Sequence, residues 1–178
     1  WHADTLRVDF VLFVTDPNAV EGGEFQYFNG TVAEVAELKK QGAPLPAEQI
    51  VSPELPGPGY AVLQQGNMVV HRAKGLDAPG ERITLVNGYV PADLSYPDFT
   101  RFDQLFLADP KHVATSEYTR HTAWMARERL RGMIENTPYG EDRDAFASDL
   151  EGIANALQTA AKNIRDADTA TMEHFGDG

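Results

Sequence analysis

Alternating apolar and polar positions predict that the first half of the chain is built from strands. Residues 6–15 have an apolar side chain at every second position on one face and further apolar residues on the other. Because successive side chains of a strand point to opposite sides, this segment is predicted to be a strand covered on both faces. The same pattern, interrupted by glycine- and proline-containing turns, predicts shorter strands at 24–28, 60–64, 68–73 and 82–89.

A helical period replaces this alternation in the second half of the chain. It predicts one helix from about Ser116 and a second from about Asp142 to Ile164. The second carries an apolar stripe at steps of three, four and seven residues, formed by Phe146, Leu150, Ile153, Leu157 and Ile164. Packing within the domain is the simpler explanation of this stripe, and a homodimer formed through the C-terminal helices is the alternative.

One shorter helix is predicted within the strand-rich half. Thr31 and Glu34 have the spacing of a capping box, and the following residues up to Leu38 suit a helix. Five prolines in residues 43–59 then indicate a long loop.

Strands first and helices last favour an α+β or mainly β core with a helical C-terminal extension. We place the core at residues 1–90, with the helix and loop inserted near 31–59. Residues 91–178 form the extension, which we expect to pack on the core. The chain begins at Trp1 and not at Met, so we expect it to be the C-terminal part of a longer protein.

Composition narrows the class of partner. The formal net charge is −12, and no basic cluster is present that would bind phosphate groups or an anionic membrane. No cysteine is present, which excludes disulfides and thiolate metal ligands. The absence of cysteine does not decide the compartment, and we expect the protein to be cytoplasmic. From the charge we expect a small-molecule substrate, with neither nucleic acid nor a membrane as partner.

Two histidines and an aspartate form a candidate metal site. His2 and Asp4 are two positions apart before the first strand, and His71 lies within a later one. On extended backbone, residues i and i+2 point to the same side, so the imidazole and the carboxylate can reach one ion together. Two imidazoles and one carboxylate suit iron(II) and leave coordination positions open. The plainer alternatives are a solvated His2 near the terminus and a hydrogen-bonded core histidine at His71.

Arg82 and Thr84 follow on the next predicted strand, where they share one face. A planar guanidinium binds both oxygens of a carboxylate, and a hydroxyl two residues away can add a hydrogen bond. For Arg82 the alternative is an ion pair with Glu24 or Glu81.

In this order the residues His2, Asp4, His71, Arg82 and Thr84 resemble the pattern of the iron(II)- and 2-oxoglutarate-dependent oxygenases, with Thr in place of the usual Ser. The resemblance covers about residues 1–90. It implies a double-stranded β-helix or jelly-roll core, and iron(II) held by the first three residues. It also implies that Arg82 and Thr84 bind the distal carboxylate of 2-oxoglutarate.

The activity implied by the resemblance is that of a dioxygenase. It would oxidise a small-molecule metabolite, most simply by hydroxylation, and release succinate and carbon dioxide. One alternative is a non-catalytic, cupin-like metal-binding β-barrel, which needs no Arg82. Another is a structural or oligomerisation module that relies on the C-terminal helices.

Overall fold

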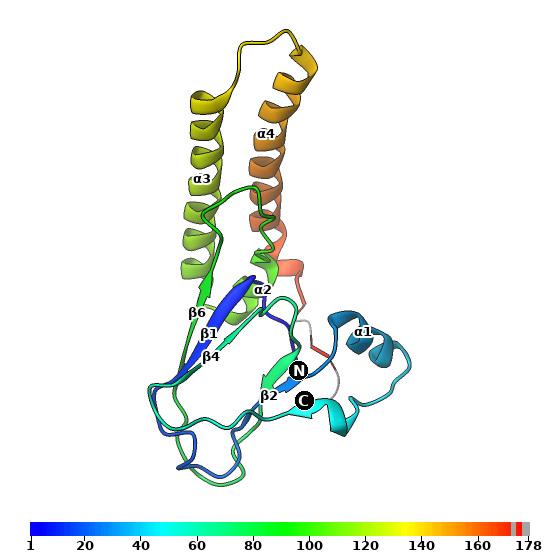
Figure 1. The fold of residues 1–178 in the computed structure, drawn as a ribbon, viewed down its shortest axis with the longest axis vertical. Helices are drawn as coiled ribbons and strands as arrows, with labels where there is room; N and C mark the ends of the chain where they lie inside the picture. Colours follow the sequence, from blue (N-terminus) through cyan, green and yellow to red (C-terminus); the bar gives the residue numbers. More distant parts are fainter. Residues whose placement is uncertain (172–173, 176–178) are drawn as a thin grey trace. The chain divides into compact units, whose positions relative to one another are not determined.

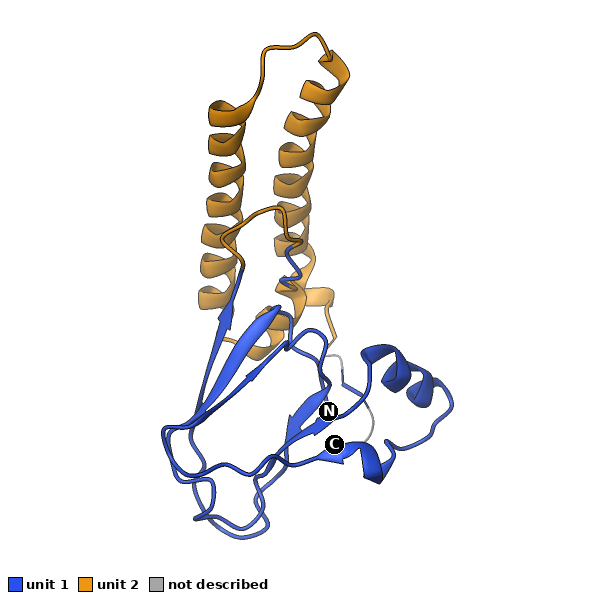
Figure 2. Cartoon of the chain, in the orientation of Figure 1, with its two compact units in different colours: residues 1–90, 98–100, 173–178 blue, residues 91–97, 101–172 orange. Residues whose placement is uncertain are grey.

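A computed structural model describes residues 1–171 and 174–175 of the chain. The chain divides into two compact units (Figure 2). Unit 1 consists of residues 1–90, 98–100 and 173–178, and unit 2 of residues 91–97 and 101–172. Strands are found in unit 1, whereas long helices form most of unit 2 (Figure 1).

The longest strand of unit 1 is the centre of its first sheet. β1 (Val8–Phe13) lies between β4 (Ala61–Gln64) and β6 (Thr84–Tyr89), and both pairings are antiparallel. Along β1 the buried positions alternate with less buried ones, and Asp9 is the only charged residue among those buried. A strand within the predicted range 6–15 is confirmed, and its buried face consists of Asp9, Val11 and Phe13. The expectation that both faces are covered is wrong, because the other face is only partly buried and Val14 is 50% exposed.

The second sheet of unit 1 is smaller. β2 (Phe25–Phe28) lies between β3 (Ile50–Val51) and β5 (His71–Ala73), again with antiparallel pairing. Apolar side chains from both sheets pack into one cluster, formed by Val11, Phe13 and Phe25 with the partly buried Tyr27, Leu55 and Val62. The interior between the two sheets is therefore apolar at this end, whereas Asp9, Gln64 and His71 are buried polar residues of the same sheets.

The helix of unit 1 packs on the other side of this second sheet. α1 (Val32–Lys40) begins at Thr31, whose side chain accepts a hydrogen bond from the backbone N–H of Glu34 while the Glu34 side chain returns one to Thr31. The predicted capping box is thus confirmed. Val35 of α1 packs against Phe28 and Val70. A short 3₁₀ helix, η1 (Ala47–Gln49), lies in the proline-rich loop that follows α1.

Unit 2 is helical. α2 (Phe102–Ala108) precedes two long helices, α3 (Lys111–Asn136) and α4 (Arg143–Asp166), and η2 (Ala167–Thr169) follows them. Its core is formed by Phe102, Ala114, Tyr118, Ala160 and Ala167.

The predicted apolar stripe of α4 is only partly covered. Ile153 is buried at 7% exposure, whereas Leu150 on the same stripe is 55% exposed. The homodimer through these helices stays a prediction. None of the helices in the part of the chain that the structure describes is both long and apolar enough to cross a membrane.

The predicted mainly β fold class is wrong. Helices hold 42% of the chain and strands 16%, and the strands form two small three-stranded sheets and not a double-stranded β-helix or jelly-roll core. The error has a simple physical origin: strands of two to six residues alternate with long loops, whereas α3 and α4 span 26 and 24 residues. α2, which the sequence pattern did not predict, adds to the helical share.

Candidate metal centre

Backbone pairing brings the two histidines together. His2 and His71 form an isolated antiparallel bridge, in which the N–H of each donates to the carbonyl of the other, at 3.0 and 2.8 Å. Directly opposed residues of such a pair point to the same side of the sheet. The segment around His2 thus adds to the free edge of β5. The Asp4 N–H donates to the carbonyl of Gly66 at 2.8 Å, which fixes this segment at a second point.

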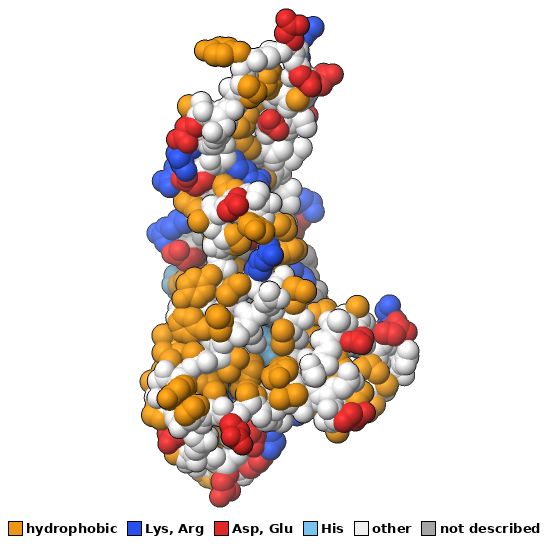
Figure 3. Space-filling view, in the orientation of Figure 1, with side chains coloured by type: hydrophobic (Ala, Val, Ile, Leu, Met, Phe, Trp, Pro, Cys, Tyr) orange, Lys and Arg blue, Asp and Glu red, His pale blue; other side chains and the backbone are white. Residues whose placement is uncertain are grey.

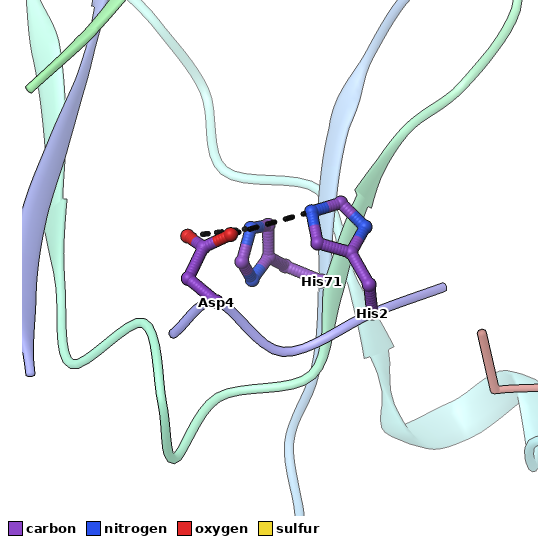
Figure 4. A group of neighbouring side chains, drawn as sticks. All are labelled: His2, Asp4 and His71. Atoms are coloured by element: carbon purple, nitrogen blue, oxygen red, sulfur yellow. Dashed lines mark ion pairs between the residues drawn. The ribbon is translucent and has the colours of Figure 1, made fainter. Parts of the chain in front are cut away.

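The three side chains converge on one point (Figure 4). The His2 Nε2 atom lies 3.5 Å from Asp4 Oδ1, and the His71 Nε2 atom lies 3.3 Å from Asp4 Oδ2. One nitrogen from each imidazole and one carboxylate oxygen all lie within 4.8 Å of one another. Donor atoms of these types at these separations can share a single divalent ion.

The orientation of His71 leaves its Nε2 atom available as a ligand. Its Nδ1 atom lies 2.9 Å from the carbonyl oxygen of Val69, and because a carbonyl can only accept, Nδ1 must carry a proton. Nε2 of the neutral imidazole then presents its lone pair. Such a backbone acceptor behind the ring is the usual way in which a metal-binding histidine is oriented. Phe25 stacks on the same ring, with centroids 5.7 Å apart.

Exposure differs across the three side chains. The His71 side chain is 6% exposed and the His2 side chain 41%. The candidate site is therefore shielded from solvent at His71 and accessible to solvent at His2. In the space-filling view, histidine atoms are visible in a hollow on the surface of unit 1, largely among apolar side chains (Figure 3).

The charged groups of the site change one another's pKa values. Burial by itself would raise the pKa of Asp4, but its hydrogen bonds with His2 and His71 hold that pKa well below the ordinary value of 3.8. Burial likewise opposes protonation of His71, yet the Asp4 carboxylate outweighs it and raises the pKa of His71 above 6.5. Without a metal ion, the Asp4 carboxylate thus favours the protonated form of His71.

Two further polar residues, which the sequence analysis did not single out as ligands, lie behind this group. Burial raises the pKa of Asp9 to about 6, and the neighbouring Asp4 carboxylate acts in the same direction. The Nε2 atom of Gln64 lies 3.3 Å from Asp4 Oδ2 and 3.2 Å from His71 Nε2. The sequence signal for Asp9 was present, because a carboxylate alternates with Val11 and Phe13 on the inward face of β1.

Arg82 and Thr84 are not brought into contact with the other three predicted residues. Across the part of the chain that the structure describes, neither forms a hydrogen bond or ion pair with His2, Asp4 or His71. Thr84 pairs directly with the buried Phe13, so both side chains point to the same side of the first sheet. The Arg82 guanidinium donates to the backbone carbonyl of Gly23, and the alternative ion pairs with Glu24 or Glu81 are absent from the described residues.

Comparison of the chain with models of protein families, with curated proteins and with solved structures finds no match.

Proposed function

We propose that this protein is an iron(II)- and 2-oxoglutarate-dependent dioxygenase that oxidises a small-molecule metabolite in the cytoplasm. The observation that carries the proposal is the convergence of His2, Asp4 and His71 within 4.8 Å, with His71 oriented by the Val69 carbonyl. Two neutral imidazoles and one carboxylate on one side of an ion form the donor set of non-haem iron oxygenases.

In this proposal each residue has a separate task. His71 supplies a rigid ligand, since its ring is buried and its Nδ1–H is already engaged. Asp4 supplies the negative charge that offsets the ion, and its lowered pKa keeps it ionised at neutral pH. The exposed His2 closes the ligand set on the solvent side, where a substrate can approach. Bound iron(II) would supply the activation of oxygen.

Arg82 is the proposed partner of the carboxylate cosubstrate. Its side chain has intermediate exposure, and it forms no ion pair among the described residues, so its charge is available to a carboxylate ligand. Thr84, two positions further on, is the first residue of β6 and points to the same side of the first sheet as Phe13. An arginine with such a neighbour suits the distal carboxylate of 2-oxoglutarate.

The charge of the chain supports a small-molecule substrate over nucleic acid. The formal net charge of −12 disfavours binding of nucleic acid, whose affinity depends on lysine and arginine contacts with phosphate.

A non-catalytic metal-binding protein is the second candidate, and the separation of Arg82 and Thr84 from the other three residues favours it. Anaerobic addition of iron(II) and then 2-oxoglutarate separates the two. The oxygenase gives the weak visible charge-transfer band of the chelate, and succinate when oxygen is admitted. Arg82→Ala should weaken the band, whereas Arg143→Ala, which removes an exposed arginine of unit 2, should not.

Metal binding with neither band nor succinate would support the non-catalytic candidate and exclude the dioxygenase. Failure to bind any divalent metal would exclude both.

A further inference from the structure

Asp9 and Gln64 form a buried polar pair next to the candidate metal centre. They are direct cross-strand partners in the pairing of β1 with β4, so their side chains lie on the same side of the sheet. Asp9 is 2% exposed and Gln64 is 8% exposed. A carboxylate and an amide in such positions need hydrogen-bond partners, because burial removes the water that would otherwise bind them.

The pair is short of donors. Both carboxylate oxygens of Asp9 and the Oε1 atom of Gln64 are buried and have no hydrogen-bond partner among the described residues. All three atoms are acceptors in their ordinary states. A buried acceptor without a donor is costly and rare, so a donor from outside the protein chain, such as a bound water molecule, would be stabilised at this cluster.

The pair lies directly against the metal ligands. The Gln64 Nε2 atom is within 3.3 Å of both Asp4 Oδ2 and His71 Nε2. A Cβ atom added to Gly66 would lie 1.8 Å from Asp9 Oδ2 and 2.9 Å from Asp4 Oδ2. The carboxylates of Asp4 and Asp9 are therefore neighbours across a position that only glycine can occupy without displacing them.

We propose that Asp9 and Gln64 are positioning residues that hold a water molecule bound to the metal ion, and this inference rests on the proposed metal site. A divalent ion makes its bound water a strong hydrogen-bond donor, which supplies the missing partner of the Asp9 carboxylate. The ion also offsets the repulsion between the carboxylates of Asp4 and Asp9. Gln64 donates to Asp4 and thereby keeps that ligand oriented.

Asp9→Asn is the first test, because it keeps the size of the side chain and removes its charge. In the full chain loaded with Co(II), we expect the metal affinity to fall by about 10- to 100-fold, the usual effect of losing a residue behind the ligands. In the metal-free protein we expect the opposite sign, a higher melting temperature, because a buried carboxylate without a partner has been removed. Asp77→Asn, which removes an exposed carboxylate of unit 1, should change neither quantity.

The bound water is observed in the Mn(II)-loaded protein by electron–nuclear double resonance, from the proton couplings that disappear in D₂O. These couplings should shift in Asp9→Asn and remain unchanged in Asp77→Asn. Gln64→Leu provides a second variant if Asp9→Asn does not fold. It should lower the Co(II) affinity in the same range, because Asp4 loses its donor.

Three results would overturn the inference. Unchanged affinity and proton couplings in Asp9→Asn would leave a metal site in which Asp9 and Gln64 have no part. Loss of both metal affinity and metal-free stability in the two variants would assign them a structural role only. A wild-type protein that binds no Co(II) or Mn(II) would remove the proposed function, and this inference with it.

Discussion

The two units use charged side chains in opposite ways. Along α3 of unit 2, the exposed Arg131 forms ion pairs with the partly buried Glu128 and the exposed Glu135, three and four residues away. In unit 1, Asp4 and Asp9 near the start of the chain meet His71, which is more than sixty residues away in sequence, in a largely buried group. Exposed pairs stabilise a helix only slightly. A buried group with unpaired acceptors lowers stability, and such costs are usually retained at functional sites.

The largest effect that would test this comparison is loss of a proposed metal ligand. His71→Ala should reduce the affinity for Co(II) by more than about 100-fold, beyond the range expected for residues behind the ligands. Isothermal titration calorimetry measures the affinity. His112→Ala, which removes an exposed histidine of α3, is the matched control and should leave it unchanged. Equal affinities of the wild type and His71→Ala would show that the buried group of unit 1 is not a metal site.

The next effect concerns the stability of unit 2. Ile153→Ala removes a buried side chain of α4 and should lower the free energy of unfolding by about 2–4 kcal/mol, the usual cost of such a truncation. Leu150→Ala on the same helix should cost much less, because that side chain is 55% exposed. Urea unfolding followed by circular dichroism measures both. Comparable losses would mean that Leu150 is covered in solution, as the predicted homodimer requires.

The contrast between the units also explains what the sequence could predict. In α4 the local period and the Asp142 cap determine the helix, so the predicted span from Asp142 to Ile164 agrees closely with Arg143–Asp166. The capping box of α1 is equally local. The fold class was harder to predict from the sequence, because it depends on how many residues belong to strands. Loops of unit 1 took up positions that the pattern had assigned to strands.

The candidate site was predictable only in part, for a related reason. His2 and Asp4 are near each other in sequence, and their alternation on extended backbone is sufficient to place them together. Asp9 and Gln64 depend on the register of β1 with β4, which a single sequence does not specify. The separation of Arg82 from the metal ligands is also a matter of register, since Thr84 pairs with Phe13, at the opposite end of β1 from Asp9.

A third test acts on the site without changing any polar group. Gly66→Ala places a methyl group where it would meet the Asp9 and Asp4 carboxylates. We expect the Co(II) affinity to fall by about 10-fold or more, because both carboxylates must move. Overpacking should also lower the free energy of unfolding by about 1–3 kcal/mol. Gly42→Ala is a control for metal affinity only, because its backbone is in the left-handed region and an added methyl group has space around it. Wild-type metal affinity in Gly66→Ala would show that the carboxylates tolerate displacement.

The fourth effect is a pH dependence that metal should reverse. The pKa values of His71 and Asp9 are higher in the metal-free fold than in the unfolded chain. The fold is therefore more stable when these two groups are protonated. The Asp9 contribution is complete below pH 3.8, the pKa of this group in the unfolded chain, and is lost as the pH rises to about 6. The His71 contribution is complete below pH 6.5 and is lost at higher pH, so the melting temperature should fall as the pH rises from about 4 to above 6.5. Asp4, whose pKa is lowered, contributes above its unfolded pKa and loses that contribution only in stronger acid.

With saturating Co(II), the increase in melting temperature due to metal should grow with pH over the same range, because His71 must lose its proton to bind. Thermal melts at several pH values, with and without metal, measure both trends. His71→Ala should make the metal-free curve flatter. An unchanged curve in that variant would show that His71 does not control the pH dependence.

The smallest effect is expected from the charges of unit 2. Glu128→Gln removes the carboxylate shared by Arg127 and Arg131, both of which are mostly exposed to solvent. We expect a slight decrease in melting temperature at low salt and none at about 1 M salt, where the Debye length is about 3 Å. Metal affinity should not change. If Glu128→Gln lowered the Co(II) affinity as strongly as Asp9→Asn, the charges of the helical unit would contribute to the metal centre, and the proposed separation of roles between the two units would be wrong.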